Sequence, residues 1–296
     1  MNSKPLVTVL INCRNEERFI SRSINSVLSQ TYRNIELLIW DDASNDNTVK
    51  IIKSFNDERI KFFSNNNHLG LGPSRCKAQD KINGELVAIL DADDEMSNTR
   101  IEKQVNEFFK NKNLTLVGSW VRYRDSDGKT IKEGFFKKIH HNIFATSKEI
   151  REKMLWRNIF VHSSIMYKKE NAIKVGWYST KLEYSQDYDL SLKLIKHSDS
   201  KIMSERLTFV TIRKESMSQS NDLKKIRLIE CLNILEKCKS DYKMNKRLSF
   251  LNSREISLNR LKLDLISELN LIIKFYRLLK TFINYPSLLF LRHRIK

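Results

Sequence analysis

The stretch ELVAILDADD, residues Glu85–Asp94, decides how the rest of the chain is interpreted. Its apolar run, Leu86–Leu90, is short and lies between Gly84 and a group of acids, which favours a strand buried on both faces over a helix. Three carboxylates follow this run directly. Carboxylates crowded at the end of a buried strand repel one another and are costly to desolvate unless a cation lies among them.

The spacing of these aspartates suits a bound cation. Asp91 and Asp93 can point to the same side of an extended chain, and carboxylate oxygens are the ligands that hard divalent cations prefer. In open α/β sheets, ligands bind beyond the carboxyl ends of the strands, which is where this cluster falls. The alternative is an acidic loop in which Asp94 caps the next helix.

Composition places the chain among globular proteins. It has 296 residues, 41% of them hydrophobic, with 3 Pro and 7 Gly, so one large domain with or without an appendage is expected. The 4 Cys show no CxxC pairing, which predicts free thiols in a reducing compartment. The first apolar run, Leu6–Ile11, is too short for a signal peptide, and no run reaches the roughly 20 apolar residues of a spanning helix. We therefore expect a cytoplasmic chain.

The net charge of +18 is unevenly distributed. From Arg213 to the end there are 19 Lys/Arg and 8 Asp/Glu, a balance of +11, which leaves +7 for the first 212 residues. Such an excess favours an anionic partner. A phosphate ligand, a nucleic acid and an anionic membrane all satisfy it.

Strand and helix patterns alternate along the first half of the sequence. Apolar runs predict strands, and runs with helical spacing predict helices between them: strands at Leu6–Ile11, Ile35–Trp40, Ile60–Phe63 and Leu86–Leu90, helices at Glu16–Gln30, Val49–Phe55 and Pro73–Ile82. This alternation predicts an α/β fold with a mostly parallel sheet flanked by helices. The second run also ends in carboxylates, Asp41 and Asp42, so two strands should deliver acids to one edge of the sheet.

After the acidic cluster, strands and helices no longer alternate regularly. The pattern predicts a helix at Thr99–Lys110, a strand at Thr115–Tyr123, a turn at Asp125–Lys129, a strand at Phe160–Tyr167, a helix at Asp187–His197 and a strand at Leu207–Ile212. Beyond Arg213 the pattern is almost wholly helical. We therefore divide the chain into a domain of residues 1–212 and a basic helical extension of residues 213–296.

Four blocks in this order resemble glycosyltransferase family 2, inverting enzymes of the GT-A fold that use nucleotide sugars. The blocks are Val7–Asn12 with Asn15, Trp40–Thr48, Leu90–Asp94 and Gln186–Leu190. The resemblance covers roughly residues 5–212. It implies a GT-A, Rossmann-like domain with a nucleotide-sugar-binding half, residues 1–95, and an acceptor-binding half, residues 96–212.

The resemblance implies a donor site at the ends of the first two strands. It makes Asp42 the contact to the uracil ring or the ribose, because a carboxylate accepts hydrogen bonds from a ring N–H or a sugar hydroxyl. The alternative is that Asp42 holds the turn Ala43–Asp46. Asn12 and Arg14 line the end of the first strand, where Arg14 departs from the tyrosine that members often carry in this segment.

The same resemblance assigns the diphosphate and its cation. The loop Asn67–Pro73 contains two glycines and leads into the N-terminus of a predicted helix, a place that favours an anion. Arg75 would pair with the diphosphate. The alternative is that Arg75 is a solvated helix residue. Asp91 and Asp93 resemble the DxD motif that holds Mn²⁺ or Mg²⁺ as a Lewis acid for the leaving group. Asp94 would be a further ligand or a contact to the acceptor sugar.

Asp187 matches the catalytic base of the family. An inverting transfer needs a carboxylate that takes the proton from the attacking acceptor hydroxyl, and a helix N-terminus stabilises such an anion. The family usually has Glu before this Asp, whereas this chain has Gln186. A plain helix cap is the alternative for Asp187. His162 and Ser163 fall on a predicted strand that faces the acceptor cleft in relatives, although a lone histidine is more often structural.

The C-terminal segment lies outside the resemblance. Residues 270–296 carry six basic residues and no acidic one. On a helix, Lys274, Arg277 and Lys280 line up opposite apolar side chains, which suits an amphipathic helix on an anionic membrane surface. A packing arm or an oligomer interface is the alternative.

These expectations describe a metal-dependent glycosyltransferase at the inner face of the cell membrane. It would move a sugar from a nucleoside-diphosphate donor, with UDP as the expected nucleotide, to a glycan or lipid-linked acceptor, as in bacterial surface polysaccharide assembly. The processive signature QxxRW is absent, which favours single additions. The rival interpretations are a nucleotidyltransferase and an inactive nucleotide- or nucleic-acid-binding scaffold. Because no RRM, KH or zinc motif occurs, we expect no nucleic-acid partner.

Overall fold

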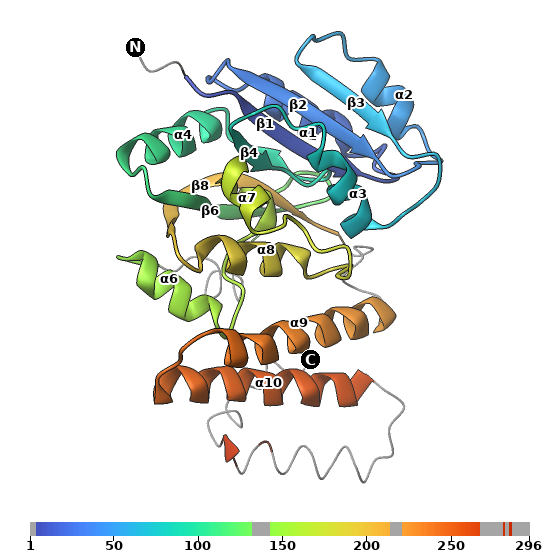
Figure 1. Ribbon diagram of the computed structural model, residues 1–296. Coiled ribbons are helices and arrows are strands. Elements are labelled where there is room, and N and C mark those ends of the chain that lie inside the picture. The colour runs from blue at the N-terminus through green and yellow to red at the C-terminus, as the bar shows by residue number, and fades with distance from the viewer. Residues whose placement is uncertain (1–3, 132–142, 214–220, 267–280, 282–283, 286–296) are drawn as a thin grey trace. The chain divides into compact units, whose positions relative to one another are not determined.

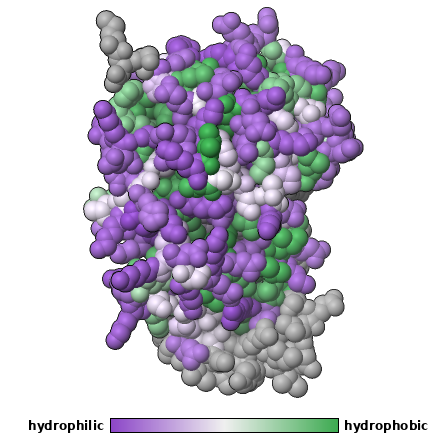
Figure 2. Space-filling model, in the orientation of Figure 1, coloured by the Kyte–Doolittle hydropathy of each residue, from purple (hydrophilic) through white to green (hydrophobic). Residues whose placement is uncertain are grey.

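The computed structural model describes residues 4–131, 143–213, 221–266, 281 and 284–285 (Figure 1). The chain forms two compact units, one of residues 1–151 and 159–213, the other of residues 152–158 and 214–296. The surface of the face drawn in Figure 2 is mostly hydrophilic, as expected for a chain with 30% charged residues.

The described elements follow one another as strand and helix through most of the first unit. In chain order they are β1 (Val7–Cys13), α1 (Ile20–Leu28), β2 (Ile35–Asp41), α2 (Thr48–Lys53), β3 (Ile60–Ser64), α3 (Leu71–Gln79), β4 (Leu86–Ile89), β5 (Glu95–Met96), α4 (Arg100–Lys110), β6 (Leu114–Asp125), α6 (Ser147–Met154), the 3₁₀ turn η1 (His162–Ser164), β7 (Met166–Lys168), α7 (Lys169–Lys174), α8 (Gln186–Ile195), β8 (Asp199–Ile212), α9 (Asn221–Asp241) and α10 (Lys246–Ile266).

The strands of the first unit form one eight-stranded sheet in the order β3-β2-β1-β4-β7-β6-β8-β5. The block β3-β2-β1-β4 is parallel, because a helix returns the chain to the starting edge after each of its strands. β7 runs antiparallel to both β4 and β6, whereas β6 and β8 are parallel. The predicted α/β fold with a mostly parallel sheet is confirmed.

The main apolar core lies on one face of this sheet. Alternate residues of β1, namely Val7, Val9 and Ile11, join it, as the two-residue period of a strand requires. Apolar residues of α1, α2 and α4 complete the cluster, to which α3 contributes none. α3 contacts β1 and β2 and is drawn on the viewer's side of the sheet in Figure 1. Helices therefore flank the sheet on both faces.

A buried carboxylate ties the parallel block together at the edge where its strands begin. Glu36 of β2 lies opposite Thr8 of β1 and accepts a hydrogen bond from the Thr8 hydroxyl. It also accepts from the backbone N–H and the side-chain amide of Asn83, at 2.7 and 2.8 Å. The Thr8 hydroxyl in turn accepts from the Gly84 N–H at 2.8 Å. These bonds join β2, β1 and the approach to β4, so they set the register of the strands that carry the aspartates.

One predicted strand is largely wrong. The pattern at Phe160–Tyr167 predicts a continuous strand, but residues His162–Ser164 form the turn η1 and only Met166–Lys168 pair as β7. The carbonyl oxygens of Ser163 and Ile165 accept hydrogen bonds from the guanidinium of Arg100. The N–H groups of Ser164 and Ile165 donate to the carbonyl oxygens of Val161 and His162, at 2.9 and 3.2 Å, so the turn uses backbone groups that a strand would pair, and the ladder is limited to Met166–Lys168.

The second unit is helical, as the sequence predicts for the region beyond Arg213. α9 and α10 pack against each other through buried apolar side chains such as Leu235 and Ile256. The buried Asn252 amide donates to the carbonyl oxygens of Leu155 and Leu235, at 2.8 and 3.0 Å. The predicted membrane-binding segment, residues 270–296, lies outside the described residues apart from 281, 284 and 285. No described helix combines the length and apolarity needed to cross a membrane.

Glu36 should make the free energy of unfolding depend on pH. Burial works against its charge, but the hydrogen bonds from Thr8 and Asn83 hold the pKa of Glu36 below its ordinary value. The ionised carboxylate therefore stabilises the fold above the unfolded-state pKa, near 4.5, and this contribution is lost as pH falls through the lower folded-state pKa. We expect Glu36→Gln to lose about 1–3 kcal/mol at pH 7. In urea titrations its stability should change less than that of the wild type as pH drops below about 4.5.

The matched control is Glu85→Gln, at an exposed glutamate on the same edge. A Glu36→Gln variant as stable as this control at pH 7 would contradict the role of the carboxylate.

Candidate active site

The site is built where β4 ends. The apolar run is buried as predicted, and the chain then turns, because the N–H of Asp94 donates to the carbonyl oxygen of Asp91 at 3.0 Å. The Ser23 hydroxyl of α1 lies 2.6 Å from the carbonyl oxygens of both Ala92 and Asp94 and holds the turn. The expectation of an extended chain through Asp91 and Asp93 is therefore wrong, and the three aspartates meet different partners.

Asp91 faces two side chains from distant elements. Its carboxylate lies 3.2 Å from Nη2 of Arg75 in α3 and 3.3 Å from Nδ1 of His162 in η1. Its side chain remains 40% exposed, so one side of the carboxylate is open to a ligand. Burial alone would raise the pKa of Asp91, but the contact with His162 and the charge of Arg75 lower it to about 2. Asp91 is therefore an anion at any physiological pH.

Asp93 pairs with an arginine from the end of the domain. Nη2 of Arg213, directly after β8, lies 2.7 Å from the Asp93 carboxylate. The same guanidinium donates to both oxygens of Glu16, at 3.0 and 2.9 Å. Burial raises the pKa of Asp93 above its ordinary value and raises that of Glu16 to about 7. Arg213 therefore holds two acids that lie 120 or more residues before it in the sequence, Glu16 and Asp93.

Asp94 is enclosed by the protein. It is 3% exposed, and its carboxylate accepts the backbone N–H of Thr211 in β8 at 2.8 Å. Burial, together with the charges of Asp93 and Asp91, raises the pKa of Asp94 well above its ordinary value. In this geometry Asp94 joins the turn to β8. Its predicted contact with an acceptor stays a prediction.

A fully buried arginine, Arg100, binds backbone carbonyl oxygens next to the Asp91–Asp94 turn. Arg100, the first residue of α4, is 0% exposed and donates to the carbonyl oxygens of Ser163 at 2.6 Å and of Ile89 and Ile165 at 3.0 Å. Its Nε donates to Gln104 at 3.0 Å. Burial lowers the pKa of Arg100 to about 9, while the charges of Asp94 and Asp91 oppose that shift. Arg100 thus joins the end of β4 to η1, the segment that carries His162.

Tyr178 connects the aspartates with the predicted base. Its hydroxyl lies 3.0 Å from Nε2 of His162, and its ring lies under the guanidinium of Arg75, 5.6 Å from the centroid. Burial raises the pKa of Tyr178 to about 12, and the negative charges of Asp187 and Asp91 contribute to that rise. Tyr178 thus contacts both partners of Asp91, namely Arg75 and His162.

The predicted base opens a helix. α8 begins at Gln186, so Asp187 lies in its first turn, where an anion is stabilised. Gln186 is 0% exposed, and neither atom of its amide finds a partner among the described residues. A glutamate in this place would bury a charge that the described residues leave unpaired. The neutral Gln186 avoids that cost.

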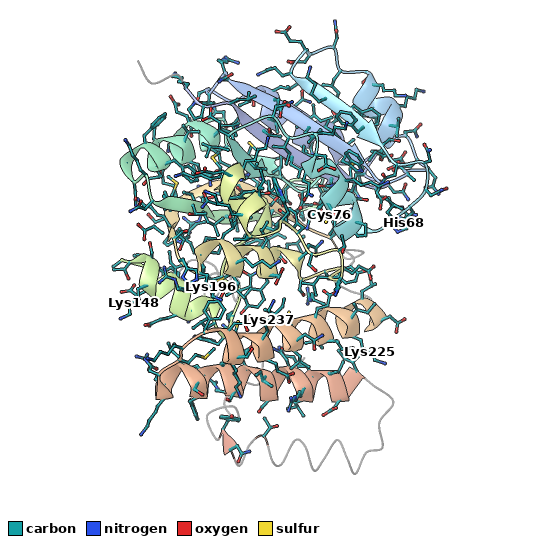
Figure 3. All side chains as sticks on the ribbon, viewed as in Figure 1. His68, Cys76, Lys148, Lys196, Lys225 and Lys237 are labelled. Carbon is teal, nitrogen blue, oxygen red and sulfur yellow. The ribbon has the colours of Figure 1, made fainter. Side chains whose placement is uncertain are left out.

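α3 packs directly against the loop that leads to α8. A Cβ on Gly72 would lie 2.5 Å from the carbonyl oxygen of Leu182, so only glycine allows this approach. One turn later, the thiol of Cys76 donates to the carbonyl oxygen of Tyr178 at 3.2 Å. Figure 3 labels Cys76 on α3 and His68 on the loop before it. The helix that carries Arg75 is thus fastened to the segment that carries Tyr178.

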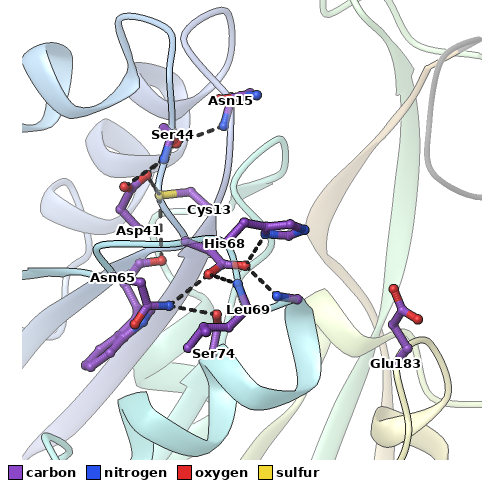
Figure 4. Close-up of polar contacts among 12 residues, drawn as sticks. Cys13, Asn15, Asp41, Ser44, Asn65, His68, Leu69, Ser74 and Glu183 are labelled. Carbon is purple, nitrogen blue, oxygen red and sulfur yellow. Dashed lines mark hydrogen bonds and ion pairs between the residues drawn. The ribbon is translucent and has the colours of Figure 1, made fainter.

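The end of β2 forms the other side of the site. Asp41, rather than Asp42, holds the turn after the strand, because its carboxylate accepts from the N–H of Ser44 at 3.0 Å and from the Ser44 hydroxyl. Asp42 instead binds the loop before α3, accepting from Asn65, His68, Leu69 and Gly70. Figure 4 shows these groups gathered at the end of β2.

Asn12 lies on β1, the strand between β2 and β4, and Arg14 follows the end of β1. Asn12 pairs with Trp40 of β2, and β1 pairs with β4 on its other side. The side-chain nitrogen of Asn12 is buried and has no acceptor among the described residues, whereas Arg14 is exposed. An unsatisfied buried donor is costly, so a ligand that accepts from Asn12 would be favoured.

The acids at the end of β4 fit a divalent cation that takes further ligands from a phosphate. No group of three or more His, Cys, Asp or Glu suited to a metal occurs among the described residues. Mg²⁺-type sites commonly use one or two carboxylates plus substrate phosphate oxygens and water. Asp91, ionised and partly exposed, and Asp93 supply such a pair.

Sequence reasoning missed several functional candidates. Glu16, Arg100, Tyr178 and Arg213 were not singled out, since each meets its partners across long sequence separations. A signal existed for Arg100, which precedes Ile101 on the apolar side of an otherwise regular amphipathic helix. A charge on an apolar face requires a buried partner.

Comparisons with known proteins agree with this geometry. Residues 8–176 match the family Glycosyl transferase family 2. An uncharacterized glycosyltransferase of Methanocaldococcus jannaschii is 36% identical over 196 residues, 65% of this chain and 65% of that protein. The UDP-Glc:alpha-D-GlcNAc-diphosphoundecaprenol beta-1,3-glucosyltransferase WfgD of Escherichia coli is 38% identical over 115 residues, 39% of this chain and 46% of that protein. These matches span about two thirds and about half of the two relatives.

Solved structures share the fold. The mannosyltransferase PcManGT from Pyrobaculum calidifontis, in complex with GDP-Man and Mn²⁺, superposes with a TM-score of 0.68 at 15% identity, over 99% of this chain and 86% of that one. S. aureus TarS 1–349 in complex with UDP-GlcNAc gives 0.59 at 16% identity, over 95% and 89%. The fold is that of GT-A glycosyltransferases, and the chain belongs to glycosyl transferase family 2.

Replacing Arg100 should destabilise the domain. Arg100→Met fills similar volume but removes the Arg100 hydrogen bonds to the carbonyl oxygens of Ile89 and Ser163, at about 1–3 kcal/mol for each group left unsatisfied, whereas the Ile165 carbonyl oxygen keeps the Ile89 N–H. We expect a loss of about 3 kcal/mol or more in urea denaturation. Arg18→Met, at an arginine that is 61% exposed, is the control and should change stability by less than about 0.5 kcal/mol. Equal stabilities of the two variants would contradict the role given to Arg100.

Proposed function

We propose that the chain transfers a single sugar from a UDP-sugar to a glycan or lipid-linked acceptor, with inversion and with help from Mn²⁺ or Mg²⁺. Residues 1–95 would form the donor half and residues 96–212 the acceptor half. The observation that carries the proposal is that Tyr178, on the segment leading to α8 and Asp187, contacts Arg75 and His162, the two partners of Asp91. Two acids with different surroundings then serve two different tasks in one site.

The donor would lie along the ends of β2, β1 and β4. The loop that Asp42 anchors, with Asn12 and Arg14, would bind the nucleoside. Arg75, fixed on Asp91 and stacked on Tyr178, would bind the diphosphate. A guanidinium that is already oriented loses little conformational entropy when it binds a phosphate.

Asp91 and Asp93 would hold the divalent cation, which when bound supplies a Lewis acid for the departing diphosphate. Asp91 is ionised and has an open side, as a ligand requires. Arg213 neutralises Asp93 in the described structure and would lie beside the diphosphate as a second positive charge. Positive groups at the place where leaving-group charge develops lower the barrier.

Asp187 would take the proton from the acceptor hydroxyl. It lies in the first turn of α8, where the helix dipole favours an anion, and burial raises the pKa of Tyr178 to about 12, so that side chain stays neutral. His162 and Asp94 would line the acceptor side. The relative WfgD is named for a UDP-sugar donor and a diphosphoundecaprenol-linked acceptor sugar, which supports both halves of the proposal. Neither nucleotidyl transfer nor an inactive scaffold gains support from the relatives.

Removing the base should stop transfer while the donor still binds. Asp187→Asn keeps the size of the side chain but cannot accept the proton, so turnover should fall by about 10²–10⁴-fold. Binding of UDP in the presence of Mn²⁺, measured by calorimetry, should change little. Asp189→Asn, in the same helix turn, is the matched control and should keep turnover within a few-fold. An Asp187→Asn enzyme that turns over at the wild-type rate would remove Asp187 as the base.

Removing Asp93 should uncouple donor binding from the metal. With wild-type protein, Mn²⁺ should strengthen UDP binding, and with Asp93→Ala this gain should largely disappear because one of two carboxylate ligands is lost. Calorimetric titrations with and without Mn²⁺ measure the effect, and Asp127→Ala, at an aspartate that is 83% exposed, is the control. If both variants keep the full Mn²⁺ gain, the cation does not bind Asp93.

A further inference from the structure

The carboxylate of Asp42 has no free acceptor site for a ligand. Its Oδ1 accepts from the Asn65 side chain at 2.8 Å and the Leu69 N–H at 2.9 Å. Its Oδ2 accepts from Nδ1–H of His68 at 2.7 Å and the Gly70 N–H at 2.9 Å. A carboxylate has about four lone-pair sites, so the protein fills them all. The Asp42 side chain is also only 8% exposed.

Of the residues bound to Asp42, His68 has a side chain that reaches solvent. Its side chain is 49% exposed, and Figure 4 shows its ring extending from the loop toward the side on which Glu183 lies. Because Asp42 accepts at Nδ1, that nitrogen carries the proton in the neutral ring. The Nε2 atom is then an acceptor held at a fixed orientation. A ring N–H is the donor that matches it.

The position suits the nucleoside end of a donor. β2 and β4 lie on either side of β1, so their ends are about 10 Å apart at ordinary strand spacing. The segment from Asn65 to Arg75 crosses this interval, with His68 bound to Asp42 at one end and Arg75 bound to Asp91 at the other. A nucleotide whose diphosphate lies at Arg75 and Asp91 would have its base near His68.

We propose that His68 determines base specificity, with Nε2 accepting the ring N–H of uracil, while Asp42 positions the histidine and does not itself contact the base. This inference rests on the proposed function and names the group that recognises its donor. Uracil offers one ring N–H between two carbonyl groups, which a single acceptor can bind, whereas adenine has an acceptor nitrogen at the corresponding place. The histidine would therefore favour UDP over ADP.

The test is calorimetric binding of UDP, ADP and inorganic pyrophosphate to the full chain, with Mn²⁺ at pH 8, where histidine side chains are generally neutral. In His68→Ala we expect UDP to bind about fivefold to tenfold more weakly, the value of one hydrogen bond, with pyrophosphate unchanged. The preference for UDP over ADP should shrink by the same factor. His197→Ala, at an exposed histidine after α8, is the matched control and should bind all three as the wild type does.

A second variant separates recognition from loop order. His68→Asn keeps a side-chain N–H for Asp42 but has no group in the place of Nε2, so it should bind UDP as weakly as His68→Ala. Wild-type affinity in His68→Asn would show that the histidine only anchors the loop and would overturn the proposal, as would unchanged UDP affinity in His68→Ala. A wild-type protein that binds no nucleoside diphosphate would instead remove the proposed function and this assignment together.

Discussion

The end of β4 carries three carboxylates within four residues, and the fold supplies an arginine for two of them. Arg75 lies against Asp91 and Arg213 against Asp93, whereas Asp94 is enclosed and accepts the backbone N–H of Thr211. Without these cations, mutual repulsion and desolvation would drive the acids to protonate or the turn to open. The two arginines come from α3 and from the residue after β8, so the domain must be assembled before the acids can lie together.

The parts of this arrangement that are local in sequence could be predicted. Leu86–Leu90 is apolar because both faces of β4 are covered, and a run of that kind followed by acids marks a strand end at the ligand-binding edge. The parallel pairing of β3, β2, β1 and β4 could also be predicted, because strands that alternate with helices pair in parallel. The partners could not be predicted, because Arg213 meets Glu16 across 197 residues and Arg100 meets Ser163 across 63, and no local pattern specifies such pairs.

The two errors share a cause, which is that a short turn replaces an expected extended segment. The strand expected at Phe160–Tyr167 starts late because the N–H groups of Ser164 and Ile165 donate within the turn η1 and not to a neighbouring strand. The extended chain expected at Asp91–Asp93 is a turn closed by the Asp94 N–H, and the Ser23 hydroxyl holds it through the carbonyl oxygens of Ala92 and Asp94. The spacing of apolar residues indicates which residues are buried, but it does not indicate which partner each backbone group finds.

The same physics links the two ends of the site. α3 begins at a loop anchored on Asp42 and carries Arg75 to Asp91, so one rigid segment spans the whole donor edge. At Gly72 its backbone touches the carbonyl oxygen of Leu182, four residues before Gln186 and the start of α8. Closely packed segments have little room to move independently. Under the proposed function, a donor that displaced α3 would therefore also displace the approach to Asp187, so donor binding and the placement of the base would be coupled.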